Sequence, residues 1–187
     1  MKNSFLLIII TLLISCRTNS QKEQKENKLD VVEYHISDDG VKFELQDWGQ
    51  KEWNDYNILK EKSKILIRKY SSKQSDIFDS ENLDLVLEKW RENNDLKKES
   101  KKEIMTLLGV GFGQDLIDSY NCDWKIYYDQ QGSDFTVIHK VYKMNLFPFS
   151  TVYKAIEKNR KGSLSNLKKT FGERISNAKK GGDYTKW

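Results

Sequence analysis

The segment spanning residues 104–156 constrains the fold most, because it holds many of the chain's core-forming side chains. Apolar and polar residues alternate from Trp124 to Tyr128 and again from Phe135 to Val141. Such alternation is typical of half-buried β-strands. Gly132 lies between the two runs and can adopt the positive φ that a tight turn requires. The segment therefore predicts an antiparallel hairpin.

Three glycines precede this hairpin: Gly109, Gly111 and Gly113. A phosphate-binding loop would need a G-x-G-x-x-G pattern between a strand and a helix. Here the spacing differs, and the glycines lie inside a run with helical periodicity that covers residues 97–120. We interpret them as the contact surface of a helix, with Gly109 and Gly113 allowing another element to approach closely.

The remaining chain predicts further elements. Residues 31–36 and 41–45 alternate around a turn-forming segment, which indicates a first hairpin. A helix is expected over residues 50–70, and a second begins at Ser80, which we expect to be its N-cap. This second helix has apolar residues at i, i+3, i+4 and i+7: Leu83, Val86, Leu87 and Trp90.

Two more helices follow the central hairpin. Pro148 precedes one that begins near Ser150, and Gly162 ends it. Ser163 is expected to cap the last helix. The order is two strands, three helices, two strands and two helices. It predicts a single α+β domain in which an antiparallel sheet of two hairpins packs against about five helices.

Length and charge agree with this interpretation. A chain of 187 residues suits one domain of ordinary size. The net charge of +4 is too small to indicate nucleic acid binding, so we expect no nucleic acid partner. Ten Lys and Arg residues against three Asp and Glu follow from Lys154 onward, which we interpret as a solvated basic face.

The amino terminus predicts export. Residues 1–4 form a short region with one positive charge, Lys2, and residues 5–14 are almost entirely apolar. This run is shorter than the roughly 20 residues that a membrane-spanning helix needs. It matches the apolar region of a secretory signal peptide.

The run ends in Leu13-Ile14-Ser15-Cys16, which resembles the lipobox of bacterial lipoproteins. The resemblance implies that Cys16 carries lipid, becomes the first mature residue and attaches the protein to a membrane. Arg17 follows in place of Asp, which implies sorting to the outer membrane. The alternative is an ordinary signal peptide cleaved nearby, with Cys16 incidental.

The expected organisation follows from these features. Residues 1–15 form the lipoprotein signal peptide, and residues 16–29 are the lipidated cysteine and a flexible tether that has no apolar residue from Arg17 to Lys28. The α+β domain covers residues 30–178, and a disordered tail covers residues 179–187. With Cys16 lipidated, Cys122 has no cysteine left for an intrachain disulfide.

Residues 80–175 resemble a bacterial family known as domain of unknown function 3806. The matching features are Leu87-Glu88-Lys89-Trp90, Leu108-Gly109-Val110-Gly111-Phe112-Gly113-Gln114, Trp124, Asp129, Gly132 and Phe147-Pro148-Phe149-Ser150. The resemblance implies a small α+β domain. It brings no established activity, cofactor or catalytic residue.

Candidate reactive residues are few. Cys122 and His139 lie on the two strands of the central hairpin and form a nucleophilic pair if a third group orients the histidine. His35, near Glu33, Asp38 and Asp39, is a weak metal candidate. We favour core or surface roles for all of them, and we expect no catalytic residue, metal or cofactor.

Exposed aromatic residues are the remaining functional lead, because Tyr and Trp suit protein or glycan contacts. The set is Trp48, Trp53, Tyr56, Tyr127, Tyr142 and Tyr153. The sequence therefore favours a membrane-anchored envelope lipoprotein that serves as a non-catalytic binding module. Inhibitor and immunity proteins are included in this class. The alternatives are an envelope hydrolase that uses Cys122 and His139, and a structural envelope protein.

Overall fold

The computed structural model describes residues 34–36, 42–71 and 77–181. The expected signal peptide, Cys16, the tether and the turn of the first hairpin lie outside these residues, as do residues 182–187. Within the described part, no helix is both long and apolar enough to cross a bilayer. The last helix ends at Lys179, and the disordered tail expected over residues 179–187 stays a prediction.

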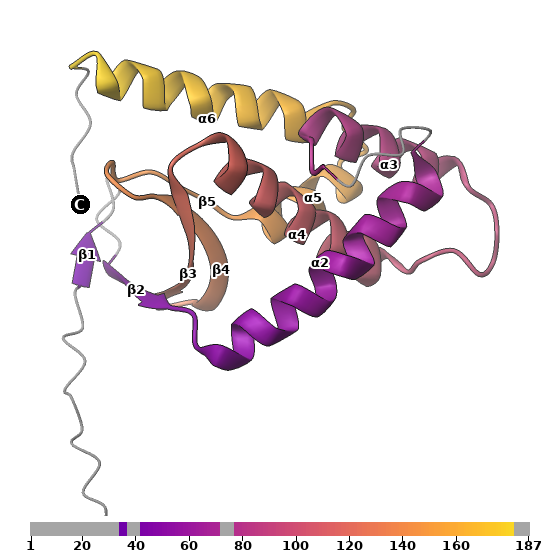
Figure 1. The fold of residues 1–187 in the computed structure, drawn as a ribbon, viewed down its shortest axis with the longest axis horizontal. Coiled ribbons are helices and arrows are strands. Elements are labelled where there is room, and N and C mark those ends of the chain that lie inside the picture. The colour runs from indigo at the N-terminus through magenta and orange to yellow at the C-terminus, as the bar shows by residue number, and fades with distance from the viewer. Residues whose placement is uncertain (1–33, 37–41, 72–76, 182–187) are drawn as a thin grey trace, which may run out of the picture. The chain divides into compact units, whose positions relative to one another are not determined.

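The sheet has five strands in the order β1-β2-β3-β4-β5, and all neighbours are antiparallel (Figure 1). The strands are β1 (Tyr34–Ile36), β2 (Lys42–Asp47), β3 (Cys122–Asp129), β4 (Gly132–His139) and β5 (Asn145–Leu146). Both predicted hairpins are confirmed, and Gly132 has a φ of 135° at the turn. β5 was not predicted, because two residues are too short to show a pattern.

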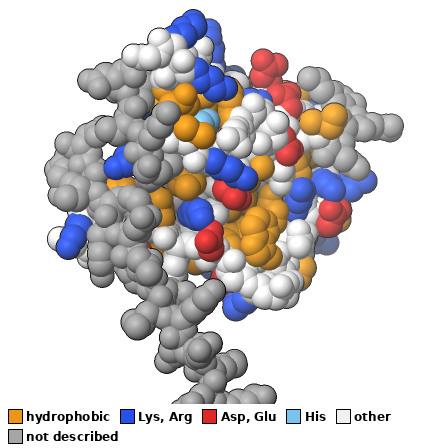
Figure 2. All heavy atoms as spheres, turned by 60° about the vertical axis from the view of Figure 1, so that its left-hand side comes forward, with side chains coloured by type: hydrophobic (Ala, Val, Ile, Leu, Met, Phe, Trp, Pro, Cys, Tyr) orange, Lys and Arg blue, Asp and Glu red, His pale blue; other side chains and the backbone are white. Residues whose placement is uncertain are grey.

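Five helices complete the described domain, which confirms the predicted α+β class. They are α2 (Gln50–Tyr70), α3 (Ser80–Glu92), α4 (Lys101–Ser119), α5 (Pro148–Glu157) and α6 (Ser163–Lys179). α4 contacts α2, α3 and α5 as well as β3 and β4. It is therefore the central helix. The sheet side of the domain, which Figure 2 brings forward, exposes hydrophobic side chains between basic and acidic ones.

The central position of α4 explains its sequence. Ile104, Leu108, Phe112 and Leu116 recur every four residues as a stripe along one side of the helix, and all four are fully buried. Val110 lies off that stripe and is buried too. The middle of α4 is therefore buried on more than one side, as expected for a helix segment enclosed by other elements.

The glycines of α4 make room for aromatic rings. A Cβ on Gly113 would overlap the indole of Trp124, and one on Gly109 would overlap the ring of Phe149. A Cβ on Gly111 would lie 3.0 Å from Phe78 Cδ1. The helix-packing interpretation is confirmed, although rings, not a backbone, occupy the space.

The expected starts of α3 and α4 are wrong. The N-cap of α3 is Asp79, whose side chain accepts a hydrogen bond from the Glu81 N–H. The Ser80 N–H donates instead to a buried carboxylate on α4. α4 begins four residues later than expected, because Ser100 and Glu103 form a capping box.

The start of α6 also differs from expectation. Gly162 occupies the N-cap position with a φ of 60°, and Ser163 is the first helical residue. As a glycine, the N-cap residue has no side chain that could accept a hydrogen bond from the first N–H groups of α6. Asp84 of α3 accepts hydrogen bonds from Leu164 N and Ser165 N instead. The cap therefore comes from another helix.

Candidate functional site

An open groove of about 490 Å³ lies at the tip of the β3–β4 hairpin. We call it the hairpin-tip groove. Its hairpin side includes Tyr127, Asp129 and Asp134, and its other side includes Asn145, Phe147 and Lys154 from β5 and α5. Two consecutive parts of the chain, the hairpin and the segment from β5 to α5, thus line one space.

The groove exists because β5 ends early. β5 pairs with β4 only through Val137 and Ile138. Pro148 then begins α5, and its ring nitrogen has no N–H to donate to a strand ladder. The chain turns into a helix instead of continuing along β4. The first residues of β4 are therefore left facing the start of α5 across the groove.

Asp134 links the two sides. Its Oδ1 accepts a hydrogen bond from Phe135 N at 2.8 Å, and its Oδ2 accepts one from Ser150 Oγ at 2.8 Å. The first contact occupies a backbone donor of β4, and the second ties this strand to the first turn of α5. Asp134 thus fixes the separation between the hairpin and the helix.

Aromatic rings form part of the groove. Tyr127 stacks on Phe43 of β2 with ring centroids 4.8 Å apart. Phe147 meets Tyr127 edge-on at 5.1 Å. Rings held on two sides lose little conformational freedom when a ligand arrives, so this wall is preorganised for apolar contact.

The groove carries charges of both signs. The α5 side has no acidic residue in its first turn, and Phe147 makes no side-chain cap. Lys154, one turn further, is exposed, and its Nζ makes no hydrogen bond or ion pair to any described residue. The hairpin side carries Asp129, whose Oδ1 accepts from Gln131 N at 2.7 Å. A ligand with polar groups of both kinds fits this arrangement.

Metal ligation has no support in the described part of the chain, which contains no group of three His, Cys, Asp or Glu residues placed to hold an ion. The side chain of His35 and the residues Glu33, Asp38 and Asp39 lie outside the described part. That candidate stays a prediction without structural information.

Cys122 and His139 are brought together, as the hairpin predicted. They are direct partners across β3 and β4, so both side chains lie on the same face of the sheet. Burial raises the pKa of the Cys122 thiol to about 12. Because the thiolate is the nucleophile, this environment makes Cys122 unreactive near neutral pH.

His139 is held by the following loop. Its Nδ1 accepts hydrogen bonds from Val141 N and Tyr142 N, each at 3.1 Å, and its ring stacks on Tyr142. Burial lowers the pKa of the imidazole. Nδ1 is therefore engaged with the backbone as an acceptor. Asp123, which follows Cys122 in the chain, forms an ion pair with Lys140 at 3.4 Å. His139 therefore holds the loop that follows β4, and the surroundings of Cys122 and His139 do not resemble those of a catalytic dyad.

The six aromatic residues that the sequence analysis proposed for protein or glycan contacts divide into packed and exposed ones. Trp48 stacks on Trp124 at 4.9 Å, and Tyr56 is buried beside it. Burial raises the pKa of Tyr56 to about 12, and its hydroxyl donates to Gln114. Trp53 and Tyr153 remain exposed. Of the six residues, Tyr127 is the one that lines the hairpin-tip groove.

Two buried carboxylates were missed by sequence reasoning. Asp84 accepts hydrogen bonds from α6, and Asp115 accepts from Ser80 N at 2.8 Å and from Lys168 Nζ at 2.6 Å. An acidic residue inside an apolar helical run was the available signal, because buried charges need partners. Both residues join helices and are structural.

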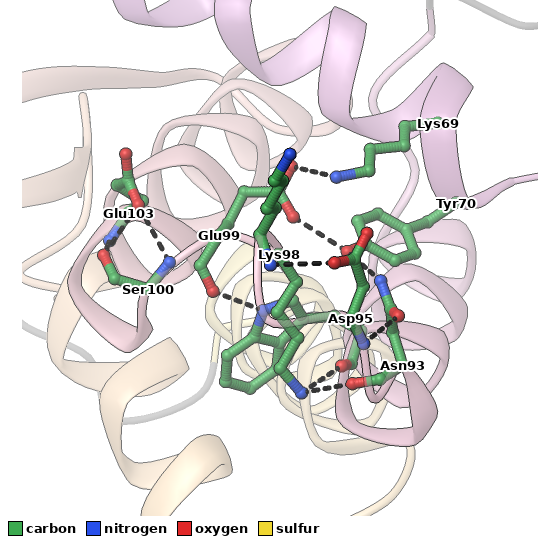
Figure 3. Close-up of polar contacts among 10 residues, drawn as sticks. Lys69, Tyr70, Asn93, Asp95, Lys98, Glu99, Ser100 and Glu103 are labelled. Carbon is green, nitrogen blue, oxygen red and sulfur yellow. Dashed lines mark hydrogen bonds and ion pairs between the residues drawn. The ribbon is translucent and has the colours of Figure 1, made fainter.

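A polar cluster fixes the loop between α3 and α4 (Figure 3). Lys98 Nζ donates to the carbonyls of Trp90 and Asn93 at the end of α3. The Glu99 carboxylate accepts from Lys69 Nζ and Tyr70 Oη, each at 2.8 Å. The loop is therefore held against the C-terminal end of α2.

Residues 84–168 match the family model described as Domain of unknown function (DUF3806). The resemblance to this family is thereby confirmed. The DUF3806 segment runs from Asp84 on α3 to Lys168 on α6, so it contains the hairpin-tip groove. β1, β2 and α2 lie outside it. No curated protein and no solved structure matches the chain.

Proposed function

We propose that the chain is a lipid-anchored protein of the bacterial cell envelope that binds a partner protein in the hairpin-tip groove without catalysis. Cys16 is the anchor in this proposal, and the outer membrane is its destination. The lipobox supports the anchor, and the groove supports the binding role. A tethered binding module of this kind acts by inhibiting its partner or by protecting the cell from it.

The observation that carries the binding role is the mixed lining of the groove. Tyr127 and Phe147 offer an apolar wall, while Asp129 and Lys154 offer charges of opposite sign. Aromatic residues with a polar rim are typical of surfaces that bind protein segments. Cys122 and His139 do not favour the hydrolase alternative, since the thiol is buried and Nδ1 of the imidazole is engaged.

Anchoring is tested by labelling cells with an alkyne-bearing fatty acid. The native chain should take up label, and the Cys16→Ser variant should not. Equal labelling of the two chains would remove the anchor from the proposal, whatever the groove binds.

Binding is tested with a photo-crosslinking amino acid at Thr151, which lines the groove. The same amino acid at Tyr153 is the control, because Tyr153 is exposed on α5 and is not part of the groove lining. We expect a discrete protein adduct from position 151 that weakens when Lys154 is replaced by Glu. Identical adducts from positions 151 and 153 would contradict the assignment.

A further inference from the structure

The outer face of α2 is a second surface that exposes large apolar side chains. Ile58 and Ile65 are 57% and 61% exposed. They are seven residues apart, which places them on one side of the helix. The buried stripe of Tyr56, Ser63 and Tyr70 faces the opposite side. α2 therefore packs through one face and presents two large aliphatic side chains on the other.

Basic residues outnumber acidic ones beside these isoleucines. Lys62 lies between them on the same face and is exposed, and its Nζ makes no hydrogen bond or close ion pair to a described residue. The exposed charged residues from 55 to 69 are Lys62, Arg68 and Lys69 against Asp55 and Glu61, whereas Lys60 points to the packed side and donates to Gln114 of α4. The outer face of α2, defined by Ile58, Lys62 and Ile65, thus combines two exposed aliphatic side chains with a small excess of basic residues.

The loop between α3 and α4 lies beside the C-terminal end of α2. Glu99 fixes the loop to Lys69 and Tyr70 at the end of α2. Leu96 in this loop is fully exposed, and Lys97 beside it is exposed as well. Residues 93–102 contain four Lys against two acidic residues. The loop therefore adds the same combination of aliphatic and basic side chains.

We propose that the outer face of α2, together with Leu96 and Lys97, rests on an anionic phospholipid surface. Lysine is depleted at the centre of protein–protein interfaces. A helix with apolar side chains among Lys and Arg is instead typical of one that lies in the membrane interface. Basic residues near an anionic leaflet each contribute favourably, and a lipid anchor supplies the proximity.

This inference rests on the proposed anchor, because the tether brings the domain to the bilayer. The tether expected over residues 16–29 has a coil length of roughly 20 Å by the square-root scaling of flexible chains. A domain held at that distance can turn one face onto the bilayer. The consequence is a fixed orientation in which the remaining surfaces, the hairpin-tip groove included, are presented to the aqueous compartment.

The test uses the mature lipidated protein in vesicles. An environment-sensitive fluorophore is attached at Ile65→Cys, while Cys122 stays unlabelled because it is 3% exposed. The matched site is Tyr153→Cys on α5, which is exposed but not on this face. The mass of the purified protein shows independently whether Cys16 carries lipid, so failure of the anchor is distinguished from failure of this inference.

With vesicles of phosphatidylcholine and phosphatidylglycerol, we expect a blue-shifted emission from position 65 and from position 65 alone. Quenching by spin-labelled lipid should follow the same pattern. Replacing Lys62 or Lys97 by Gln should lower the ratio of docked to undocked protein by about fivefold for each cation. High salt should act in the same direction.

Several outcomes would overturn the inference. One is an unshifted emission at position 65 in protein whose lipid is confirmed by mass. Another is an equal shift at positions 65 and 153. A shift of the same size in pure phosphatidylcholine would show that anionic lipid is not recognised. A photo-crosslinker at position 65 that captures a protein in place of lipid would assign the face to a protein interface.

Discussion

Asp84 and Ser165 are 81 positions apart in sequence, yet one carboxylate oxygen of Asp84 accepts both the backbone N–H and the hydroxyl of Ser165, at 2.9 and 2.8 Å. The other oxygen accepts from Leu164 N. Gly162 provides no side-chain cap for α6. A residue of α3 therefore satisfies the free donors that every helix start exposes.

Replacing Asp84 by Ala should destabilise the fold. The first N–H groups of α6 would lose their acceptor in a buried place, which costs about 1–3 kcal/mol. Urea unfolding of the purified protein measures this change. Glu92→Ala is the matched control, since Glu92 is an exposed acidic residue on the same helix. Equal unfolding midpoints for the two variants would show that the contact is dispensable.

The glycines of α4 give a second prediction. Gly113→Ala places a methyl group against the indole of Trp124, and Gly111→Leu forces a larger side chain against Phe78 and Leu83. Overfilling a packed core costs typically about 1–3 kcal/mol. We expect lower melting temperatures in both variants, with the larger loss for Gly111→Leu.

Lys102→Ala on the exposed side of α4 should leave the melting temperature nearly unchanged. Trp fluorescence should shift in Gly113→Ala, because Trp124 must move. A Gly111→Leu protein with the native melting temperature would disprove the packing assigned to α4.

The sequence predicted the parts of this fold that have periodic patterns. The 50–70 helix, both hairpins and the turn at Gly132 were found because apolar spacing and turn residues act locally. The starts of α3 and α6 were misplaced because their donors are satisfied by Asp115 and Asp84, which are distant in sequence. Local propensity carries no information on such tertiary caps.

The candidate site was harder to predict than the fold. Tyr127 and Asp129 are ordinary strand and turn residues in the sequence, and Lys154 reads as part of a basic surface. They share a groove because β5 stops after two residues and Pro148 redirects the chain. Cys122 and His139 were paired correctly, but the burial that makes the thiol unreactive depends on tertiary packing and could not be seen in the strand pattern.

Cys122 provides a prediction about pH. Burial raises the pKa of this thiol from 9.0 to about 12. A group whose pKa is raised on folding stabilises the fold fully below its unfolded pKa and loses this contribution as the pH rises toward the folded pKa. We therefore expect the native chain to lose stability between about pH 9 and 12 by an amount that Cys122→Ala does not show.

Chemical denaturation at a series of pH values measures the difference between the two proteins. Tyr56 contributes to alkaline destabilisation in both, so it cancels. In addition, a disulfide reagent at pH 8 should modify Cys122 slowly in the folded protein and rapidly in guanidinium. Fast modification of the folded chain would revive the hydrolase alternative, as would loss of the biological phenotype in both Cys122→Ala and His139→Ala.

The Asp134–Ser150 contact gives the last prediction, which concerns the groove. Ser150→Ala removes the hydrogen bond that ties β4 to the first turn of α5, at a cost near that of one hydrogen bond, about 1 kcal/mol. Because this bond sets the separation of the two sides, capture of the partner from position 151 should fall more than the stability does. Thr170→Ala, which removes an exposed hydroxyl contact on α6, should change neither property appreciably. A Ser150→Ala protein that captures its partner as well as the native chain would show that the width of the hairpin-tip groove does not govern binding.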